Sequence, residues 1–94
     1  MIAVVARLPV AEGKEAEFES VMAELASQVL DNEEGCKLYK LCKPLQPGPY
    51  VMIERYVDQE AFSVHAKTPY FQAAFGKLGA LLSGAPEIEI LSEL

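Results

Sequence analysis

The sequence predicts a single α+β domain over residues 1–94, with the element order β-α-β-β-α-β. Three observations support this prediction. Ninety-four residues leave no room for two separate cores, whereas a hydrophobic share of 51% is ample for one. Four segments have the length and the apolar pattern of strands, and they are separated by segments with apolar residues at helical spacing. Proline and glycine fall between the segments, where turns are expected.

The first half of the chain predicts a strand, a helix and a second strand. Residues 1–8 form an apolar, β-branched run that Pro9 ends, which is typical of a strand covered on both faces. Between about Gly13 and Leu30, apolar residues recur every three or four positions and glutamates occupy mostly the other side. This pattern predicts an amphipathic helix. Residues 36–43 then alternate as a strand.

The next prediction is a hairpin. Pro47 and Gly48 suit the two central positions of a type II turn, which needs a positive φ at its second central residue. Residues 50–57 are again strand-like, so they should return antiparallel to the strand before them.

The second helical segment is predicted to be divided in two. Asp58 is a favourable N-cap for a short helix, and Thr68 with Pro69 supplies a second cap and a proline at the first helical position. The helix that follows carries apolar residues on one face as far as Leu82. Residues 87–94 alternate glutamate with isoleucine and predict the last strand.

This element order is that of a ferredoxin-like fold, a four-stranded antiparallel sheet with helices on one face. The strands at residues 1–8 and 50–57 are apolar at both alternating positions, so the helix-free face should be apolar as well. Monomers rarely expose an apolar patch of that size. We therefore expect a homodimer that packs sheet on sheet, or a higher oligomer.

Composition excludes several classes of protein. The net charge of −6 repels phosphate backbones and anionic surfaces, which argues against nucleic-acid binding. No apolar run approaches the roughly 20 residues that span a bilayer, and the N-terminus lacks the features of a signal peptide, so we expect no membrane association and a cytoplasmic location. One histidine and the separated Cys36 and Cys42 provide no metal-ligand cluster, so no metal is expected.

His65 is the only imidazole of the chain and falls on the apolar face of the predicted short helix, so it should point inward. Its ordinary pKa of about 6.5 suits a general base at neutral pH. The alternative is a core histidine whose nitrogens are satisfied by backbone or carboxylate partners.

Glu54 lies in the middle of the strand at residues 50–57 and should be buried, where a carboxylate needs a partner. It would orient His65 or accept a substrate hydroxyl. The alternative is an ion pair with Arg7, Lys40 or Arg55.

Aromatic residues concentrate around the same strand and the divided helix. They would line a pocket for a flat aromatic ligand or simply fill the core. The set comprises Tyr39, Tyr50, Tyr56, Phe62, Tyr70, Phe71 and Phe75.

The chain resembles the antibiotic biosynthesis monooxygenase domain in two segments, the opening MIAVVARLPVAEGKEAEFE and the middle ERYVDQEAFSVHAKTPYFQAAF. The middle segment is the more specific. It places Glu54, Tyr56, His65 and Phe71 on the pocket motif of the family. Two positions depart from the family pattern, because Tyr56 stands where many members have Trp and Tyr70 where many have a second His.

The resemblance implies a dimeric α/β-barrel built from two ferredoxin-like subunits. It also implies an activity similar to that of quinol monooxygenases, which oxidise quinols or polycyclic phenols with O2 and use no metal, flavin or haem. The expected partners are accordingly a second copy of the chain, a small aromatic substrate and O2, with no cofactor.

The leading hypothesis from the sequence is therefore a cofactor-independent monooxygenase of a small phenol or quinol, with His65 as the base and Glu54 holding its tautomer. Tyrosine hydroxyls would bind substrate oxygens and phenylalanines would form a dry wall. The predicted substrate-binding residues are Tyr39, Tyr56, Phe62, Tyr70, Phe71 and Phe75. Two alternatives remain, an isomerase of a small carbonyl compound and a non-catalytic ligand-binding or stress-associated dimer.

Overall fold

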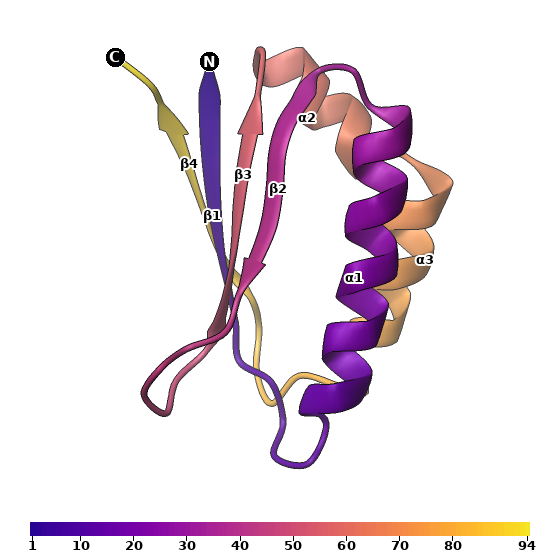
Figure 1. Ribbon diagram of the computed structural model, residues 1–94, viewed down its shortest axis with the longest axis vertical. Helices are drawn as coiled ribbons and strands as arrows, with labels where there is room; N and C mark the ends of the chain where they lie inside the picture. Colours follow the sequence, from indigo (N-terminus) through magenta and orange to yellow (C-terminus); the bar gives the residue numbers. More distant parts are fainter.

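The computed structural model describes all 94 residues and has the predicted order of elements (Figure 1). The second helical segment is divided into two helices. The elements are β1 (Ile2–Leu8), α1 (Glu15–Asn32), β2 (Cys36–Cys42), β3 (Tyr50–Tyr56), α2 (Gln59–Ala66), α3 (Pro69–Leu78) and β4 (Glu87–Ser92).

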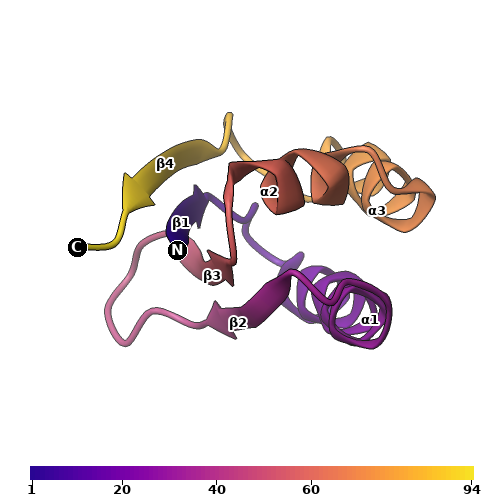
Figure 2. The same ribbon diagram turned by 90° about the horizontal axis from the view of Figure 1, so that it is seen from above.

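The four strands form one open antiparallel sheet in the order β2-β3-β1-β4, and all three helices cover the same face of it (Figures 1 and 2). β1 is central and pairs with β3 from Ile2 opposite Tyr56 to Leu8 opposite Tyr50. The two termini lie at the same end of the sheet (Figure 1). The ferredoxin-like fold predicted from the sequence is confirmed.

The core lies between the sheet and α1. Side chains three or four positions apart on α1 are fully buried, as the helical spacing predicts. They pack with the helix-facing residues of the sheet, and burying each large apolar side chain contributes about 1.5–3 kcal/mol. The buried residues of α1 are Phe18, Met22, Leu25 and Val29.

The division between α2 and α3 has the predicted cause. The Asp58 side chain accepts a hydrogen bond from the Ala61 N–H at 2.8 Å and begins α2. The Thr68 hydroxyl donates to the His65 carbonyl at 2.9 Å and accepts from the Phe71 N–H at 3.3 Å, which closes α2 and begins α3. The same threonine therefore fixes the backbone of His65.

Two local predictions are wrong. The last helix ends at Leu78 and not at Leu82, because Leu81 turns back into the core and its carbonyl accepts from the Ala11 N–H at 2.8 Å, while Leu82 bridges to Val10. The turn at Gly48 is not type II, since the only residue with positive φ is Gly13. Residues 43–49 are long enough to reverse the chain without that conformation.

The helix-free face of the sheet is apolar at its centre. Its residues alternate with those that face the helices, and Ile53 and Leu91 are 38% and 43% exposed there. Ion pairs border the apolar centre, with the Arg7–Glu89 pair at 3.2 Å. The homodimer remains a prediction. Among the helices of this fold, none combines the length and the apolar character that crossing a membrane requires.

Candidate active site

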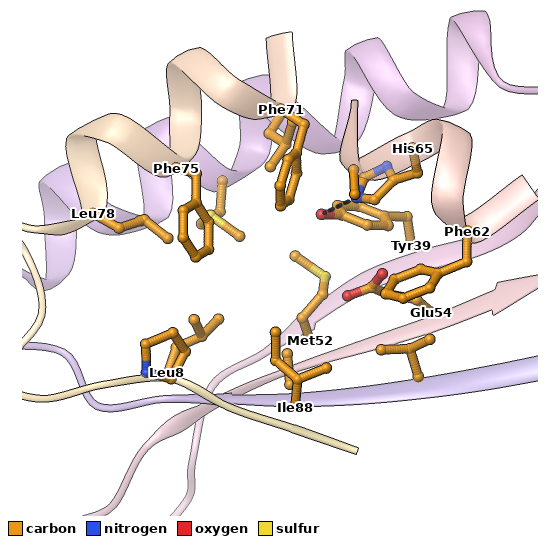
Figure 3. Close-up of a pocket in the computed structure, with 16 residues that line it drawn as sticks. Leu8, Tyr39, Met52, Glu54, Phe62, His65, Phe71, Phe75, Leu78 and Ile88 are labelled. Atoms are coloured by element: carbon orange, nitrogen blue, oxygen red, sulfur yellow. Dashed lines mark hydrogen bonds between the residues drawn. The ribbon is translucent and has the colours of Figure 1, made fainter. Parts of the chain in front are cut away.

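A cavity of about 270 Å³ lies between the helix-facing side of the sheet and the helices (Figure 3). Sixteen residues line it, and only Tyr39, Glu54 and His65 among them carry a side-chain oxygen or nitrogen. The exposed lining residues are Phe75 on α3 and Ile88 on β4, at 44% and 53%. The cavity therefore opens between α3 and β4 and has a dry wall with a few polar groups, which is usual for small-molecule sites.

His65 projects from α2 into the wall of this cavity and is only 1% exposed, so it points inward as predicted (Figure 3). Its Nδ1 lies 3.1 Å from both carboxylate oxygens of Glu33. Its Nε2 lies 3.5 Å from the Tyr39 hydroxyl. An ionised carboxylate only accepts hydrogen bonds, so these partners assign the hydrogen to Nδ1 and the lone pair to Nε2.

Burial lowers the pKa of His65 below its ordinary value, although the adjacent Glu33 carboxylate acts in the opposite direction. The imidazole is therefore neutral at pH 7. A neutral ring with a lone pair on Nε2, at the wall of an apolar cavity, has the charge state that a general base needs.

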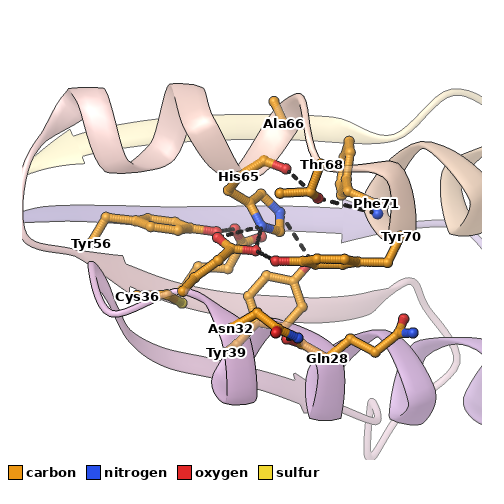
Figure 4. A network of polar contacts seen from close by, with 12 residues as sticks. Gln28, Asn32, Cys36, Tyr39, Tyr56, His65, Ala66, Thr68, Tyr70 and Phe71 are labelled. Carbon is orange, nitrogen blue, oxygen red and sulfur yellow. Dashed lines mark hydrogen bonds and ion pairs between the residues drawn. The ribbon is translucent and has the colours of Figure 1, made fainter.

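Glu33 is the residue that the sequence reading missed. It lies just after α1, and its side chain is 8% exposed. The Tyr70 hydroxyl donates to the same carboxylate, so a tyrosine and a histidine converge on it. Figure 4 shows the side chains of His65 and Tyr70 in this network of polar contacts. Burial, followed by this hydrogen bond, raises the pKa of Tyr70 to about 12, which keeps the phenol protonated as a donor.

Glu54 faces the cavity from β3, is 5% exposed, and accepts a hydrogen bond of 2.6 Å from the Tyr56 hydroxyl. Burial raises its pKa to about 7, and the Tyr56 hydrogen bond only partly opposes this. Both the protonated and the ionised form are thus populated near neutral pH. A carboxyl group in this state can donate or accept a proton.

The predicted partners of Glu54 are not those observed. Arg7 and Arg55 pair with Glu89 and Glu93 instead, at 3.2 Å and 2.9 Å. Glu33, rather than Glu54, contacts His65. The reason is register, because alternate residues of a strand face opposite sides and Arg55 cannot share a face with its neighbour.

The predicted substrate-binding residues separate into two groups. Tyr39, Phe62, Phe71 and Phe75 line the cavity. Tyr56 and Tyr70 do not, and their hydroxyls are bound to the two glutamates. Contact of these two hydroxyls with a substrate stays a prediction, and in this structure both donate to carboxylates of the protein.

Comparison with known proteins decides the family. A sequence model of the family described as antibiotic biosynthesis monooxygenase matches residues 1–77. The chain belongs to the antibiotic biosynthesis monooxygenase family. The match runs from β1 into the last turn of α3, so it includes Glu33, Glu54 and His65. The β4 wall of the cavity lies outside it.

Solved structures similar to this member of the antibiotic biosynthesis monooxygenase family cover almost the whole chain. A protein from Caulobacter crescentus CB15, with antibiotic biosynthesis monooxygenase as its suggested activity, is 41% identical at a TM-score of 0.94, over 99% of this chain and 89% of its own. A conserved protein from Methanosarcina mazei Go1 is 30% identical at a TM-score of 0.93, over 99% and 92%. Among curated proteins, none matches the chain.

No group of three or more His, Cys, Asp or Glu side chains is arranged to hold a metal ion. The polar groups of the cavity are suited to hydrogen bonding and proton transfer.

Proposed function

We propose that the chain is a cofactor-independent monooxygenase that oxidises a neutral phenol or quinol with O2 in this cavity. The observation that carries the proposal is the buried, neutral His65 at the wall of an otherwise apolar cavity. Membership of the antibiotic biosynthesis monooxygenase family supports the same activity.

The lining of the cavity favours an uncharged aromatic substrate. No Lys or Arg side chain lines it, and one carboxyl group, Glu54, does. A second carboxylate, that of Glu33, lies directly behind His65. Such a site repels anions and gives a phosphate group no cationic partner, whereas the rings of Phe62, Phe71 and Phe75 offer stacking surfaces.

The chemistry asks little of the protein beyond orientation and proton transfer. The Tyr39 hydroxyl lies 3.5 Å from His65 Nε2. When a substrate binds, this hydroxyl turns to donate to the substrate oxygen, and Nε2 takes the proton of that substrate hydroxyl. The resulting phenolate is electron-rich enough to pass one electron to O2, and the radical pair combines to form a carbon–oxygen bond. For a quinol, loss of water from the hydroperoxide then gives a hydroxyquinone, so one O2 is consumed and one water is released.

Glu54 is assigned to the second proton transfer. Cleavage of the O–O bond needs a proton on the departing oxygen, and the carboxyl group of Glu54 faces the cavity with a pKa of about 7. Tyr56 holds one of its oxygens at 2.6 Å and leaves the other free. In this proposal His65 and Glu54 are the catalytic residues, and Tyr39, Phe62, Phe71 and Phe75 bind the substrate.

We further propose that two copies pack through the helix-free faces of their sheets, as the exposed Ile53 and Leu91 favour. An obligate interface of this kind buries on the order of 2,000 Å² or more. Sedimentation at micromolar concentration should show a dimer, and Ile53→Asp should dissociate it. A monomeric wild type under these conditions would contradict the proposed dimer. It would leave the catalytic proposal unaffected.

The activity is tested by oxygen uptake across a panel of benzoquinols, naphthoquinols and polycyclic phenols, with 18O2 used to trace the product oxygen. We expect stoichiometric uptake, one labelled oxygen in the product and saturation with at least one member of the panel. A reaction without protein corrects for uncatalysed autoxidation. If the wild type consumes oxygen no faster than this blank with every compound, the monooxygenase proposal is wrong.

A further inference from the structure

The turn between α1 and β2 holds Glu33 firmly. Its N–H donates to the Val29 carbonyl at 2.9 Å, and its carbonyl accepts from the Cys36 N–H at 3.1 Å. Both backbone groups are thus used, one to close the helix and one to begin the strand. The Cα of Glu33 is therefore fixed relative to α1 and β2.

The same turn lies unusually close to α2. A Cβ atom on Gly35 would stand 2.7 Å from the Cβ of Ala61, a distance that real Cβ atoms do not show. The Gly35 carbonyl accepts from the Val57 N–H at 2.8 Å, which joins the turn to the segment that leads into α2. Only glycine permits this approach, and the approach brings Glu33 within reach of His65.

The carboxylate of Glu33 bridges two other elements. Both of its oxygens lie 3.1 Å from His65 Nδ1 on α2, and one of them also accepts from the Tyr70 hydroxyl on α3. It does not line the cavity. Glu33 therefore acts on the imidazole and not on a ligand.

We propose that Glu33 is the positioning residue of His65. It keeps the hydrogen on Nδ1, so that the lone pair on Nε2 faces the cavity, and it stabilises the imidazolium that forms when Nε2 takes a proton. Tyr70 in turn holds Glu33. This inference rests on the proposed function, because it specifies how the base of that reaction works.

The proton balance is simple. One proton moves from a substrate hydroxyl to Nε2, while the hydrogen on Nδ1 stays in place on its bond to Glu33. A negative charge appears on the substrate and a positive charge on His65, beside the negative Glu33. At a site with little water, the adjacent carboxylate lowers the cost of that positive charge. Other titratable groups around the imidazole and Glu33 are Cys36, Tyr39, Glu54, Tyr56 and Tyr70.

The test uses the fact that the chain has a single histidine. A long-range 1H–15N NMR spectrum of uniformly 15N-labelled protein shows one imidazole, so its tautomer and its titration are read without ambiguity. In the wild type we expect the neutral ring to carry its hydrogen on Nδ1. In Glu33→Gln we expect the pKa of His65 to fall by about one unit, because the carboxylate that favours the charged ring is gone.

Kinetics give the second readout. In Glu33→Gln, kcat should fall by about 10–100-fold with little change in KM, and the acidic limb of its pH profile should move to lower pH with the pKa of His65. The matched control is Glu34→Gln, which removes the same charge from the neighbouring, exposed residue. Tyr70→Phe should preserve the tautomer and shift the pKa by less than Glu33→Gln does.

Glu33→Asp guards against a variant that fails to fold, since it keeps the charge but draws the carboxylate back from the ring by one methylene. It should lower the pKa of His65 by less than Glu33→Gln. The proposal is wrong if His65 carries its hydrogen on Nε2 in the wild type, or if folded Glu33 variants leave its titration unchanged. If the shifts appear but no quinol is oxidised, Glu33 still positions His65 and the proposed function fails by itself.

Discussion

The side chains of Glu33 and Glu54 are both largely buried near one cavity, yet they are held in different ways. Glu54 lies mid-strand, lines the cavity and has one side-chain donor, Tyr56. Glu33 lies in a turn, outside the cavity wall, and has two partners, Tyr70 and His65. One carboxyl group therefore faces the substrate, whereas the other faces the base.

The difference shows how a small fold obtains two acid–base functions from one residue type. Burial with a single donor raises the pKa of Glu54 to about 7, so the group exchanges protons near neutral pH. Glu33 instead accepts hydrogen bonds from two protein donors and does not line the cavity. Each role follows from the partners and not from the carboxyl group itself.

The largest expected effect comes from removing His65, which connects Glu33 to the cavity. We expect His65→Ala to lower turnover of an accepted quinol by about 10²–10⁴-fold, the usual contribution of a general base. Glu54→Gln should lower turnover by roughly 10–100-fold, because the first proton transfer still has His65 as its base and only the second loses its catalytic group.

Rate and melting temperature are measured on the same preparations. Since His65 is buried, the alanine variant should also have a free energy of unfolding that is lower by about 1–2 kcal/mol. A His65→Ala protein that turns over normally per folded molecule would show that the histidine is only structural.

The next effect is the pH dependence of stability that Glu54 introduces. Its pKa of about 7 in the folded state lies above the ordinary 4.5, so the folded state binds this proton more tightly than the unfolded chain. The proton on Glu54 therefore stabilises the folded state fully below pH 4.5, and this stabilisation is lost as pH rises to about 7. The loss amounts to at most about 3 kcal/mol.

Glu54→Gln lacks this titration and should gain stability over the wild type as pH rises. Urea unfolding of both proteins at pH 5 and pH 8 gives the comparison, and the difference between the two proteins cancels the titration of His65. If the variant has the same advantage at both pH values, Glu54 does not titrate as described.

A third change acts at the turn that holds Glu33 against α2. Gly35→Ala places a methyl group against Ala61 and should destabilise the fold by about 1–3 kcal/mol, as overpacking does. Because α2 must move, turnover should fall as well. Gly48→Ala is the control, since the nearest atom to a Cβ there is 3.9 Å away. Equal stability of the two alanine variants would contradict the close approach.

Hydrophobic periodicity sufficed to predict the fold, because each strand and helix buries one regular face. The same logic found Glu54, which interrupts an alternating strand, and His65, which lies on the apolar face of α2. Both signals are local, so a single sequence contains them.

Glu33 had no such signal. It lies in a turn next to Glu34, and only the packing of that turn against α2 decides which of the two glutamates is buried. The roles of Tyr56 and Tyr70 were missed for the same reason, since a pattern shows that an aromatic is buried but not where its hydroxyl points. The end of α3 at Leu78 likewise depends on a contact with the distant Ala11.

The smallest expected effect is the difference in stability loss between removing the hydroxyl of Tyr56 and removing that of Tyr70, the two tyrosines that donate to the glutamates. Tyr56 is fully buried, and Tyr56→Phe leaves Glu54 without its side-chain donor at a cost of about 1–3 kcal/mol. Tyr70→Phe should cost about 0.5–1.5 kcal/mol, because Glu33 keeps His65 and Tyr70 is only partly buried. The difference between the free-energy losses of the two variants should be smaller at pH 5, because a protonated Glu54 is less costly to leave without a hydrogen-bond donor. Chemical unfolding of both variants at pH 5 and pH 8 measures it, and a larger loss for Tyr70→Phe at pH 8 would mean that Glu33 depends on its tyrosine more than Glu54 does.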